Sequence, residues 1–264
     1  MSDHDLPLVS IITPSFNQAP YLEETIRSVL EQDYPRIEYI VVDGGSADGS
    51  VSIIKKYADK LAWWVSEVDQ GQTDAINKGF GRAKGQILAW LNSDDTYEPG
   101  AVSAAVKFLQ ENPDVGMVYA DCNYIDEESR KIGKFPAAQT DYRRLRRGYV
   151  HIPQQTMFFR KGLWHTVGPL DPSFYFAMDY DLWVRIASHA AIKYLPGQTW
   201  ANFRIHPSGK TIAADDRCWP EMLRVHYRDD GSFFSVIVAK YYIRKLIAPL
   251  WNWRRLKMLK ISKD

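Results

Sequence analysis

The chain has 264 residues, which is enough for one large α/β domain or two small ones with an ample core. Its hydrophobic fraction of 45% and charged fraction of 25% are those of an ordinary globular protein. The formal net charge of +1 gives no reason to expect nucleic acid as a partner, and no apolar run is long enough to predict a membrane-spanning helix.

Two features indicate the compartment. The first residues lack a basic region followed by an apolar core, so we expect no signal peptide. Cys122 and Cys218 lie far apart and match no metal or redox spacing, which favours a reducing environment. We therefore expect a cytoplasmic protein.

Strand-like and helix-like segments alternate through the first half of the chain. Short apolar runs predict buried strands at 8–13, 37–43, 61–67 and 86–91. Apolar residues that recur on one helical face predict helices at 21–32, 51–60, 73–85 and 101–113. This interleaving predicts an α/β fold with a Rossmann-like, mostly parallel sheet and helices on both faces.

Polar residues follow three of these strands, in the segments TPSFNQ (13–18), DGGSADGS (43–50) and NSDD (92–95). Open α/β sheets bind ligands beyond the carboxyl ends of their strands, so the three segments together predict a site there. Asp94 and Asp95 would repel each other unless a cation held both charged, and Mg²⁺ prefers such oxygen ligands. A helix cap with a solvated neighbour is the simpler explanation of the pair taken alone.

Residues 9–50 and 66–95, with their motifs in this order, resemble the nucleotide-binding half of a family 2 glycosyltransferase with the GT-A fold. The resemblance implies a nucleotide-sugar-binding half at 1–120 and an acceptor-binding half of the same domain at 121–212. A helical, basic and aromatic extension would follow at 213–264.

The resemblance implies a nucleoside diphosphate sugar as donor, usually a UDP-sugar, and a divalent metal, Mn²⁺ or Mg²⁺. The TPSFN segment would line the nucleotide, Asp43 would bind the base, and the start of the helix at 73–85 would lie beside the sugar. The NSDD segment would be the Asp-x-Asp motif that holds the metal and the diphosphate. The expected donor-site residues are Thr13, Pro14, Ser15, Asn17, Asp43, Gly45, Ser46, Asp69, Asp74, Asn77, Lys78, Asn92 and Asp94.

The expected metal ligands are Asp94, Asp95 and His206. A lone histidine is more often structural, but the family places one in a similar R-x-H context at the metal or diphosphate. The sequence departs from the family at Gly44 and Asn92, where members often have Asp. Asn92 keeps an oxygen ligand but loses a charge, so Asp94 and Asp95 would have to provide the negative charge that the metal needs.

Inverting transfer needs a base that deprotonates the acceptor hydroxyl. The family has Glu-Asp before a helix, with the Asp as base, and the matching pair here is Met178 and Asp179. Asp181 is the less favoured substitute. The apolar Met178 is expected to raise the pKa of Asp179. Gln154 and Gln155 match a segment near the acceptor.

The tail from residue 233 mixes aromatic and basic residues and predicts either helices packed on the domain or an anchor on anionic lipid. The residues concerned are Lys240, Ile243, Arg244, Lys245, Trp251, Trp253, Arg254, Arg255 and Lys257.

The sequence thus predicts an inverting transferase that moves a hexosyl or N-acetylhexosaminyl group to a glycan or lipid-linked acceptor in polysaccharide assembly. Peripheral association with the inner membrane face is part of this prediction. A nucleotidyltransferase is less favoured because no Gly-rich basic loop follows the first strand. Processive synthesis is disfavoured because Gln-x-x-Arg-Trp is missing. The alternative is a non-catalytic nucleotide-sugar-binding or scaffold protein, which Met178 and Asn92 keep open.

Overall fold

The computed structural model describes residues 6–210, 215–229, 231–243 and 245–246. The strands are β1 Val9–Ser15, β2 Ile37–Asp43, β3 Trp63–Ser66, β4 Ile87–Trp90, β5 Thr96–Tyr97, β6 Val115–Ile125, β7 Lys131–Lys134, β8 Phe158–Arg160 and β9 Ala191–Arg204. The helices are α1 Ala19–Leu30, α2 Ser50–Lys56, α3 Gln72–Arg82, α4 Ala101–Glu111, α5 Tyr142–Leu145, α6 Lys161–Val167, α7 Met178–Ala187 and α9 Asp215–Arg228, with 3₁₀ turns η2 Ala58–Lys60 and η3 Gln154–Thr156.

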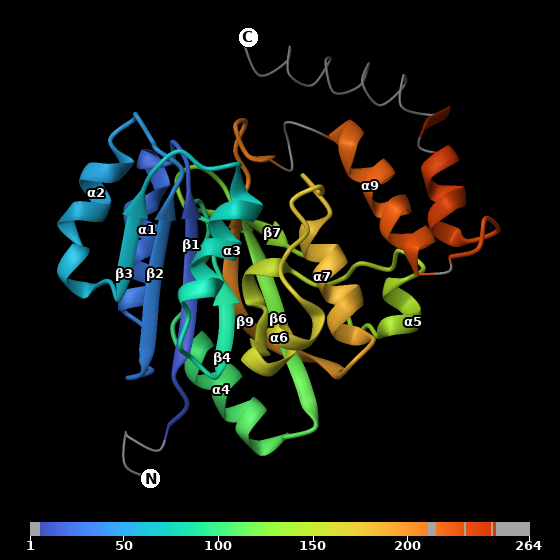
Figure 1. Ribbon diagram of the computed structural model, residues 1–264, viewed down its shortest axis with the longest axis horizontal. Helices are drawn as coiled ribbons and strands as arrows, with labels where there is room; N and C mark the ends of the chain where they lie inside the picture. Colours follow the sequence, from blue (N-terminus) through green and yellow to red (C-terminus); the bar gives the residue numbers. More distant parts are fainter. Residues whose placement is uncertain (1–5, 211–214, 230, 244, 247–264) are drawn as a thin grey trace.

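The described strands form one sheet in the order β3-β2-β1-β4-β8-β6-β9-β5, and β7 pairs with β6 (Figure 1). The first four strands of this order are parallel, as the alternation of strands and helices predicts. β8 is antiparallel to both β4 and β6, while β6 and β9 form a long parallel pair. The predicted mixed, mostly parallel sheet is confirmed.

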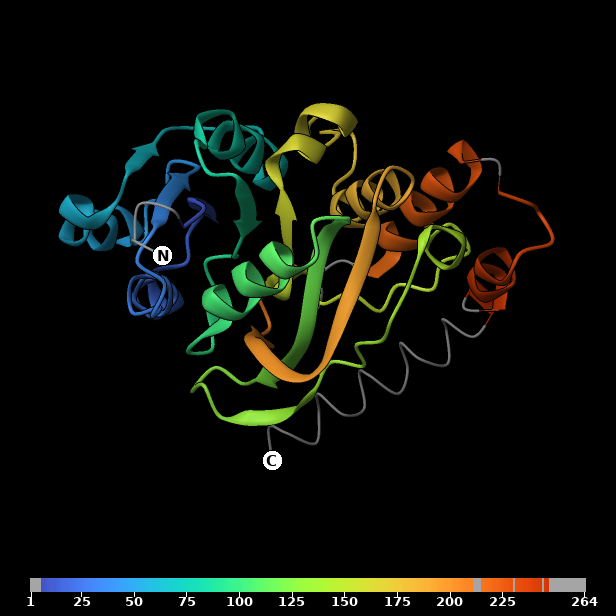
Figure 2. The same ribbon diagram turned by 90° about the horizontal axis from the view of Figure 1, so that it is seen from below.

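Helices cover both faces of the sheet, with α3, α6 and α7 on one side and α1 and α4 on the other (Figure 2). Successive side chains of a strand point to opposite faces of the sheet, so Ile12 of β1 belongs to the first apolar cluster and Ile11 to the second. α3 lies so close to β1 that a Cβ on Gly79 would be 2.6 Å from Ile12. A larger residue at position 79 would push the helix off the sheet.

β9 is the element that local patterns miss. Pro196 and Gly197 interrupt its apolar run and are typical of a turn. The strand absorbs them in a bulge, since Leu195 pairs with Ala120 and the next paired residue, Thr199, pairs with Asp121.

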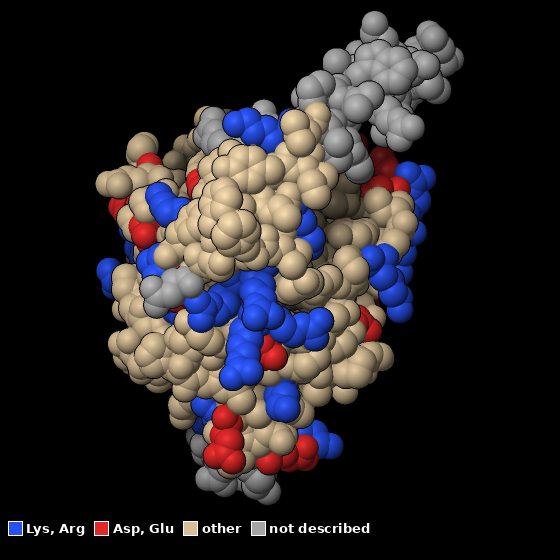
Figure 3. Space-filling view, turned by 90° about the vertical axis from the view of Figure 1, so that its right-hand side faces the viewer, with Lys and Arg blue, Asp and Glu red and all other residues tan. Residues whose placement is uncertain are grey.

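The C-terminal extension begins with α9, and residues 236–243 are also helical. Both lie with α5 on the side of the molecule that faces the viewer in Figure 3. Arg244, Trp251, Trp253, Arg254, Arg255 and Lys257 lie outside the described residues. Within the described part of the chain, no helix is long and apolar enough to cross a membrane.

Candidate functional site

The three polar strand ends meet at one edge of the sheet. The register pairs Ser15 of β1 with Asp43 of β2, and the amide of Leu91, just beyond β4, donates to the carbonyl of Ile12 on β1. Segments that are far apart in sequence are therefore neighbours at the carboxyl ends of parallel strands, where open sheets bind ligands.

Asp43 is buried and organises the loop that follows β2. Its Oδ2 accepts hydrogen bonds from the amides of Gly45 (3.1 Å) and Ser46 (2.9 Å) and from the Ser66 hydroxyl (2.7 Å). Its Oδ1 accepts one from the Ser46 hydroxyl at 2.5 Å. The structure thus assigns Asp43 a loop-building role, and direct contact with a base stays a prediction.

The segment after β1 locks onto the same loop. The Asn17 amide donates to Ser46 Oγ at 2.8 Å, and Asn17 Oδ1 accepts from the Ala47 amide at 3.0 Å. Thr13 and Pro14 are buried. The Thr13 hydroxyl contacts the Tyr39 hydroxyl inside the protein, away from the ligand-binding edge of the sheet. Ser15 Oγ is buried without a hydrogen-bond partner among the described residues, and its contact with a nucleotide stays a prediction.

Gly44 and Asp69 share one space beside this loop. A Cβ on Gly44 would lie 2.9 Å from Asp69 Oδ2. Burial raises the pKa of Asp69, whose Oδ1 accepts a hydrogen bond from the Gly71 amide at 2.8 Å. The departure from Asp to Gly at position 44 therefore has a steric reason, because the Asp69 carboxylate occupies the volume.

Asp94 and His206 point at one another, although 112 residues separate them in sequence. His206 Nε2 lies 3.0 Å from Asp94 Oδ2, and the Asp94 side chain is 17% exposed. His206 Nδ1 contacts Ser208 Oγ, and Tyr21 packs on the ring with centroids 4.7 Å apart. A carboxylate oxygen and an imidazole nitrogen are both groups that can bind a divalent cation.

Asp95 points the opposite way, into the core. Its Oδ2 accepts from Gln155 Nε2 (2.9 Å) and Asn92 Nδ2 (3.2 Å), and its Oδ1 accepts from the Arg204 amide (3.0 Å). Burial and the charge of Asp94 raise the pKa of Asp95 well above its usual range. The two adjacent carboxylates are thus not equivalent, and only Asp94 faces His206.

A chain of amide hydrogen bonds joins the acidic cluster to the loop after His206. Lys210 Nζ donates to Gln72 Oε1 at 2.8 Å, and Gln72 Nε2 donates to Asn92 Oδ1 at 2.8 Å. Asn92 Nδ2 also contacts Gln154 Oε1 at 3.2 Å. Gln154 and Gln155, expected near the acceptor, are buried supports of the acidic cluster.

Asp179 lies in the first turn of α7, near Lys210. Burial raises its pKa to about 6, against the opposing effects of the Tyr180 amide and the charge of Lys210. Burial also lowers the pKa of Lys210 to about 8, although Asp179 and Glu221 act to raise it. Met178 is buried and its sulfur accepts a hydrogen bond from the Thr73 hydroxyl at 2.9 Å, so it does not obstruct the carboxylate.

Asp181, the less favoured candidate base, is held by two arginines. It is fully buried and forms ion pairs with Arg185 (2.8 Å) and Arg228. Its two carboxylate oxygens are taken by these guanidinium groups, so Asp181 is placed to hold the fold together.

Several expected donor-site residues serve the fold. Asn77 clamps the backbone of Leu170 through both its amide atoms, and Lys78 is ion-paired with Glu67 at 2.6 Å. Asp74 accepts a hydrogen bond from the Gln70 amide at 3.2 Å. Their contact with a nucleotide stays a prediction.

Arg204 is occupied in the same way. Its guanidinium is buried between Glu24, the Asp94 carbonyl and the 126–129 turn. Lys210 is therefore better placed than Arg204 to neutralise a diphosphate.

Sequence reasoning missed Glu221 of α9. Its carboxylate accepts hydrogen bonds from the amides of Tyr175, Phe176 and Ala177, at the start of the helix that carries Asp179. No local signal could reveal this, because the partners are more than 40 residues away.

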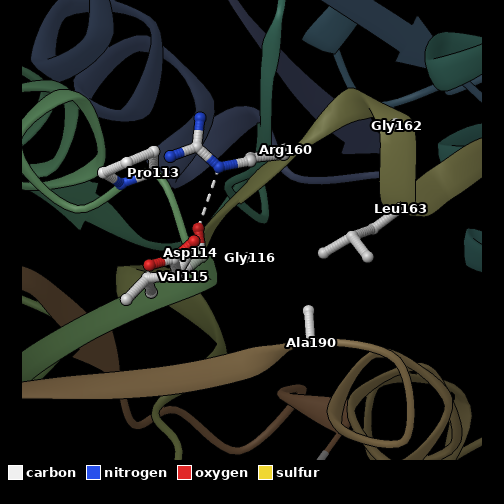
Figure 4. Close-up of a pocket in the computed structure, with 8 residues that line it drawn as sticks. All are labelled: Pro113, Asp114, Val115, Gly116, Arg160, Gly162, Leu163 and Ala190. Atoms are coloured by element: carbon white, nitrogen blue, oxygen red, sulfur yellow. Dashed lines mark hydrogen bonds between the residues drawn. The ribbon is translucent and has the colours of Figure 1, made fainter.

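A separate hollow lies at the amino end of β6 (Figure 4). It is lined by Pro113, Asp114, Val115, Gly116, Arg160, Gly162, Leu163 and Ala190. The Arg160 side chain is already bound to the carbonyls of Val115 (2.8 Å) and Leu109 (2.6 Å). The hollow therefore offers little chemistry and lies at the opposite edge from the strand-end cluster.

The fold and the strand-end cluster are those of an open α/β sheet, a class in which ligands bind at the carboxyl edge. The glycosyl transferase family 2 profile matches residues 10–167. An uncharacterized glycosyltransferase of Mycobacterium tuberculosis is 35% identical over 184 residues, which cover 69% of each protein. One of Rickettsia typhi is 31% identical over 216 residues, covering 79% of this chain and 67% of the relative. The chain therefore belongs to glycosyl transferase family 2.

Solved structures share the fold. TarS residues 1–349 of S. aureus, in complex with UDP-GlcNAc, gives a TM-score of 0.69 at 18% identity, covering 87% of this chain and 67% of that one. The mannosyltransferase PcManGT from Pyrobaculum calidifontis, in complex with GDP-Man and Mn²⁺, gives 0.64 at 22%, covering 92% and 71%. The predicted GT-A-like fold is confirmed.

Proposed function

We propose that this glycosyltransferase is an inverting enzyme that takes a UDP-sugar as donor and a hydroxyl of a glycan or lipid-linked molecule as acceptor. One observation supports this most strongly. The hydrogen bonds from Lys210 through Gln72 to Asn92 join the surroundings of Asp179 to the acidic cluster, so base and diphosphate groups belong to one site.

Asp179 is the proposed base. Its Oδ1 accepts a hydrogen bond from the Tyr180 amide at 2.7 Å, so we assign the acceptor proton to Oδ2. A carboxylate with a pKa of about 6 is ionised at neutral pH and still a competent proton acceptor. Lys210, close by, adds positive charge where the sugar leaves the diphosphate.

The proposed metal site consists of Asp94 and His206, with Asp95 as a support behind Asp94. In the described part of the chain no group of three or more His, Cys, Asp or Glu could hold a metal alone. Two protein ligands completed by diphosphate oxygens suit Mg²⁺ or Mn²⁺. A bound divalent cation would supply charge stabilisation for the departing diphosphate.

A thermal-shift panel with UDP, GDP, dTDP and CMP, each with and without Mn²⁺ or Mg²⁺, tests the proposal. A ligand at about 100 times its Kd adds roughly 2.7 kcal/mol to the free energy of unfolding. We expect UDP to stabilise the protein only with metal, and Asp94→Ala to abolish the shift while the variant stays folded. Asp95→Ala should lower the melting temperature itself. If no nucleotide gives a shift with or without metal, the proposal fails and a scaffold role is favoured.

A further inference from the structure

The RRLRRG segment, residues 143–148, and the helix at 236–243 form one continuous surface. Ile237 is fully buried against Gly148, where a Cβ would lie 2.7 Å from the isoleucine side chain. Lys240 Nζ lies 5.2 Å from the centre of the Tyr149 ring. α9 fastens the same loop, since His226 Nδ1 donates to the carbonyl of Arg146. We call residues 143–149, 233–243 and 245–246 the basic-aromatic face.

This face is strongly cationic in a chain whose formal net charge is only +1. Arg143, Arg147, Lys240 and Lys245 are exposed on it. The described residues 231–243 and 245–246 include these two lysines and contain no Asp or Glu. Figure 3 shows blue side chains gathered below a large tan bulge on this side of the molecule.

Large apolar side chains stand in water on the same face. Phe234 is 95% exposed and Leu246 is 79% exposed, and Phe233, Tyr242 and Ile243 are each about half exposed or more. Single exposed apolar residues are common, but so many within one short segment indicate an interaction site.

We propose that the basic-aromatic face docks on an anionic phospholipid bilayer. Phe234 and Leu246 would enter the boundary between headgroups and acyl chains, while Arg143 and Arg147 would meet lipid phosphates. A symmetric contact between two copies would bring this cationic face against itself, which like-charge repulsion opposes. Nucleic acid would satisfy the charges but leave the aliphatic side chains in water.

The docking deepens the proposed function, on which this step rests, because it brings the base to the bilayer. The Tyr180 hydroxyl donates to the carbonyl of Leu145, inside the RRLRRG segment, at 2.6 Å. Tyr180 follows Asp179 directly, so the base helix is bonded to the loop that would touch lipid. The acceptor class that fits this placement is a hydroxyl on a lipid-linked molecule.

Co-sedimentation of the full chain with vesicles tests the docking. We expect binding to vesicles of phosphatidylcholine and phosphatidylglycerol in equal parts, weakening as salt rises, and little binding to phosphatidylcholine alone. The double variants Arg143→Glu with Arg147→Glu, and Phe234→Ser with Leu246→Ser, should each lose about tenfold or more of the binding. Lys55→Glu with Lys60→Glu, at exposed residues of the α2 region, is the matched control and should bind as the native chain does.

Three results would overturn the docking: no sedimentation with either vesicle, equal sedimentation with neutral lipid, or variants that change the oligomeric state and leave vesicle binding intact. The metal-dependent nucleotide shift, measured on the same variants, separates this from the proposed function. Its absence in a native chain that binds vesicles would overturn the donor assignment alone.

Discussion

At the scale of single residues, Asp179 and Asp181 show how surroundings divide identical side chains. Both lie in the first turn of α7, where Asp181 is fully buried and Asp179 is partly exposed. Asp179 has a neighbouring lysine that offsets little of the cost of burial, so its pKa rises to about 6. Asp181 forms ion pairs with two arginines, Arg185 on its own helix and Arg228 on α9. The first is suited to accept a proton and the second to fix the helix.

Asp179→Asn should abolish transfer and yet stabilise the fold at neutral pH. Loss of a general base costs about 10²–10⁴-fold in rate. The folded pKa of about 6 lies above the unfolded value near 3.9, so the native chain loses stability as pH rises through this window. The Asp179→Asn variant does not lose this stability, so by pH 7 its free energy of unfolding should exceed that of the native chain by at most about 3 kcal/mol. Kinetics and denaturant melts at pH 4.5 and 7.5 measure both effects.

Asp181→Asn is the matched control for that experiment. The substitution removes the buried carboxylate that pairs with both Arg185 and Arg228, so the free energy of unfolding should fall by about 3–5 kcal/mol. A stabilised Asp181→Asn, or a stable and fully active Asp179→Asn, would reverse the assignment of the base.

The transfer rate should depend on pH with a limb set by the same carboxylate. We expect kcat to rise with pH and level off above an apparent pKa near 6, because only the ionised Asp179 accepts the proton. A stopped assay that follows UDP release between pH 5 and 8 measures this limb. A rate that is flat across that range would exclude Asp179 as the titrating base.

Gly44 and Gly81 make a matched pair for steric predictions. Gly44→Ala should destabilise the fold and weaken donor binding, because the new methyl group lies 2.9 Å from the Asp69 carboxylate. Gly81 is in α3 with open space around it, so Gly81→Ala should stabilise by about 0.5–1 kcal/mol. Melting temperatures of the two variants give the comparison, and equal shifts would rule out the crowding.

Residue types at the site could be predicted, but side-chain directions could not. The sequence indicates that Asp94 and His206 belong to the acidic edge, and the structure brings them within 3.0 Å. It does not reveal that Asp95 turns inward, since that depends on Gln155 and Arg204, 60 and 109 residues away.

At the scale of elements, α9 completes α7. The residue before α7 is Ala177, which provides no side-chain cap, and the first amides of a helix need acceptors. Glu221 of α9 accepts hydrogen bonds from the amides of Tyr175, Phe176 and Ala177 directly before α7, and its negative charge suits the positive end of the α7 dipole. The helix that holds the proposed base is therefore positioned by the C-terminal extension.

Glu221→Ala should destabilise the protein by about 1–3 kcal/mol, since it leaves charge-assisted hydrogen bonds unmade. We expect kcat to fall as well, because the segment that leads into α7 then loses its hydrogen bonds to Glu221. Glu221→Gln keeps an acceptor oxygen and should recover part of both losses. Melting curves and kcat for the two variants measure this, and an Ala variant equal to the native chain would show that the cap is dispensable.

The elements of the first half follow from local periodicity, and the structure has them in the predicted order. Local periodicity does not predict β9, because its Pro196 and Gly197 have the local signature of a turn. Long-range pairing with β6 overrides that signature, which no window of neighbouring residues can show.

At the scale of the whole molecule, the two predicted halves share one sheet and two cores. β5 of the first half pairs with β9 of the second, and β4 pairs with β8. Ile12 and Trp183, from opposite halves, lie in the same apolar cluster. Unfolding one half would expose the core of the other, so the halves should not unfold separately.

We therefore expect residues 6–210 to unfold in a single cooperative transition, even though chains of this length often show intermediates. Far-ultraviolet circular dichroism reports the helices, and tryptophan fluorescence reports Trp90 in the first half together with Trp183 and Trp200 in the second. Both probes should give the same midpoint and the same slope in urea. Separate midpoints would mean that the acceptor half has stability of its own and that the shared sheet does not couple it to the donor site.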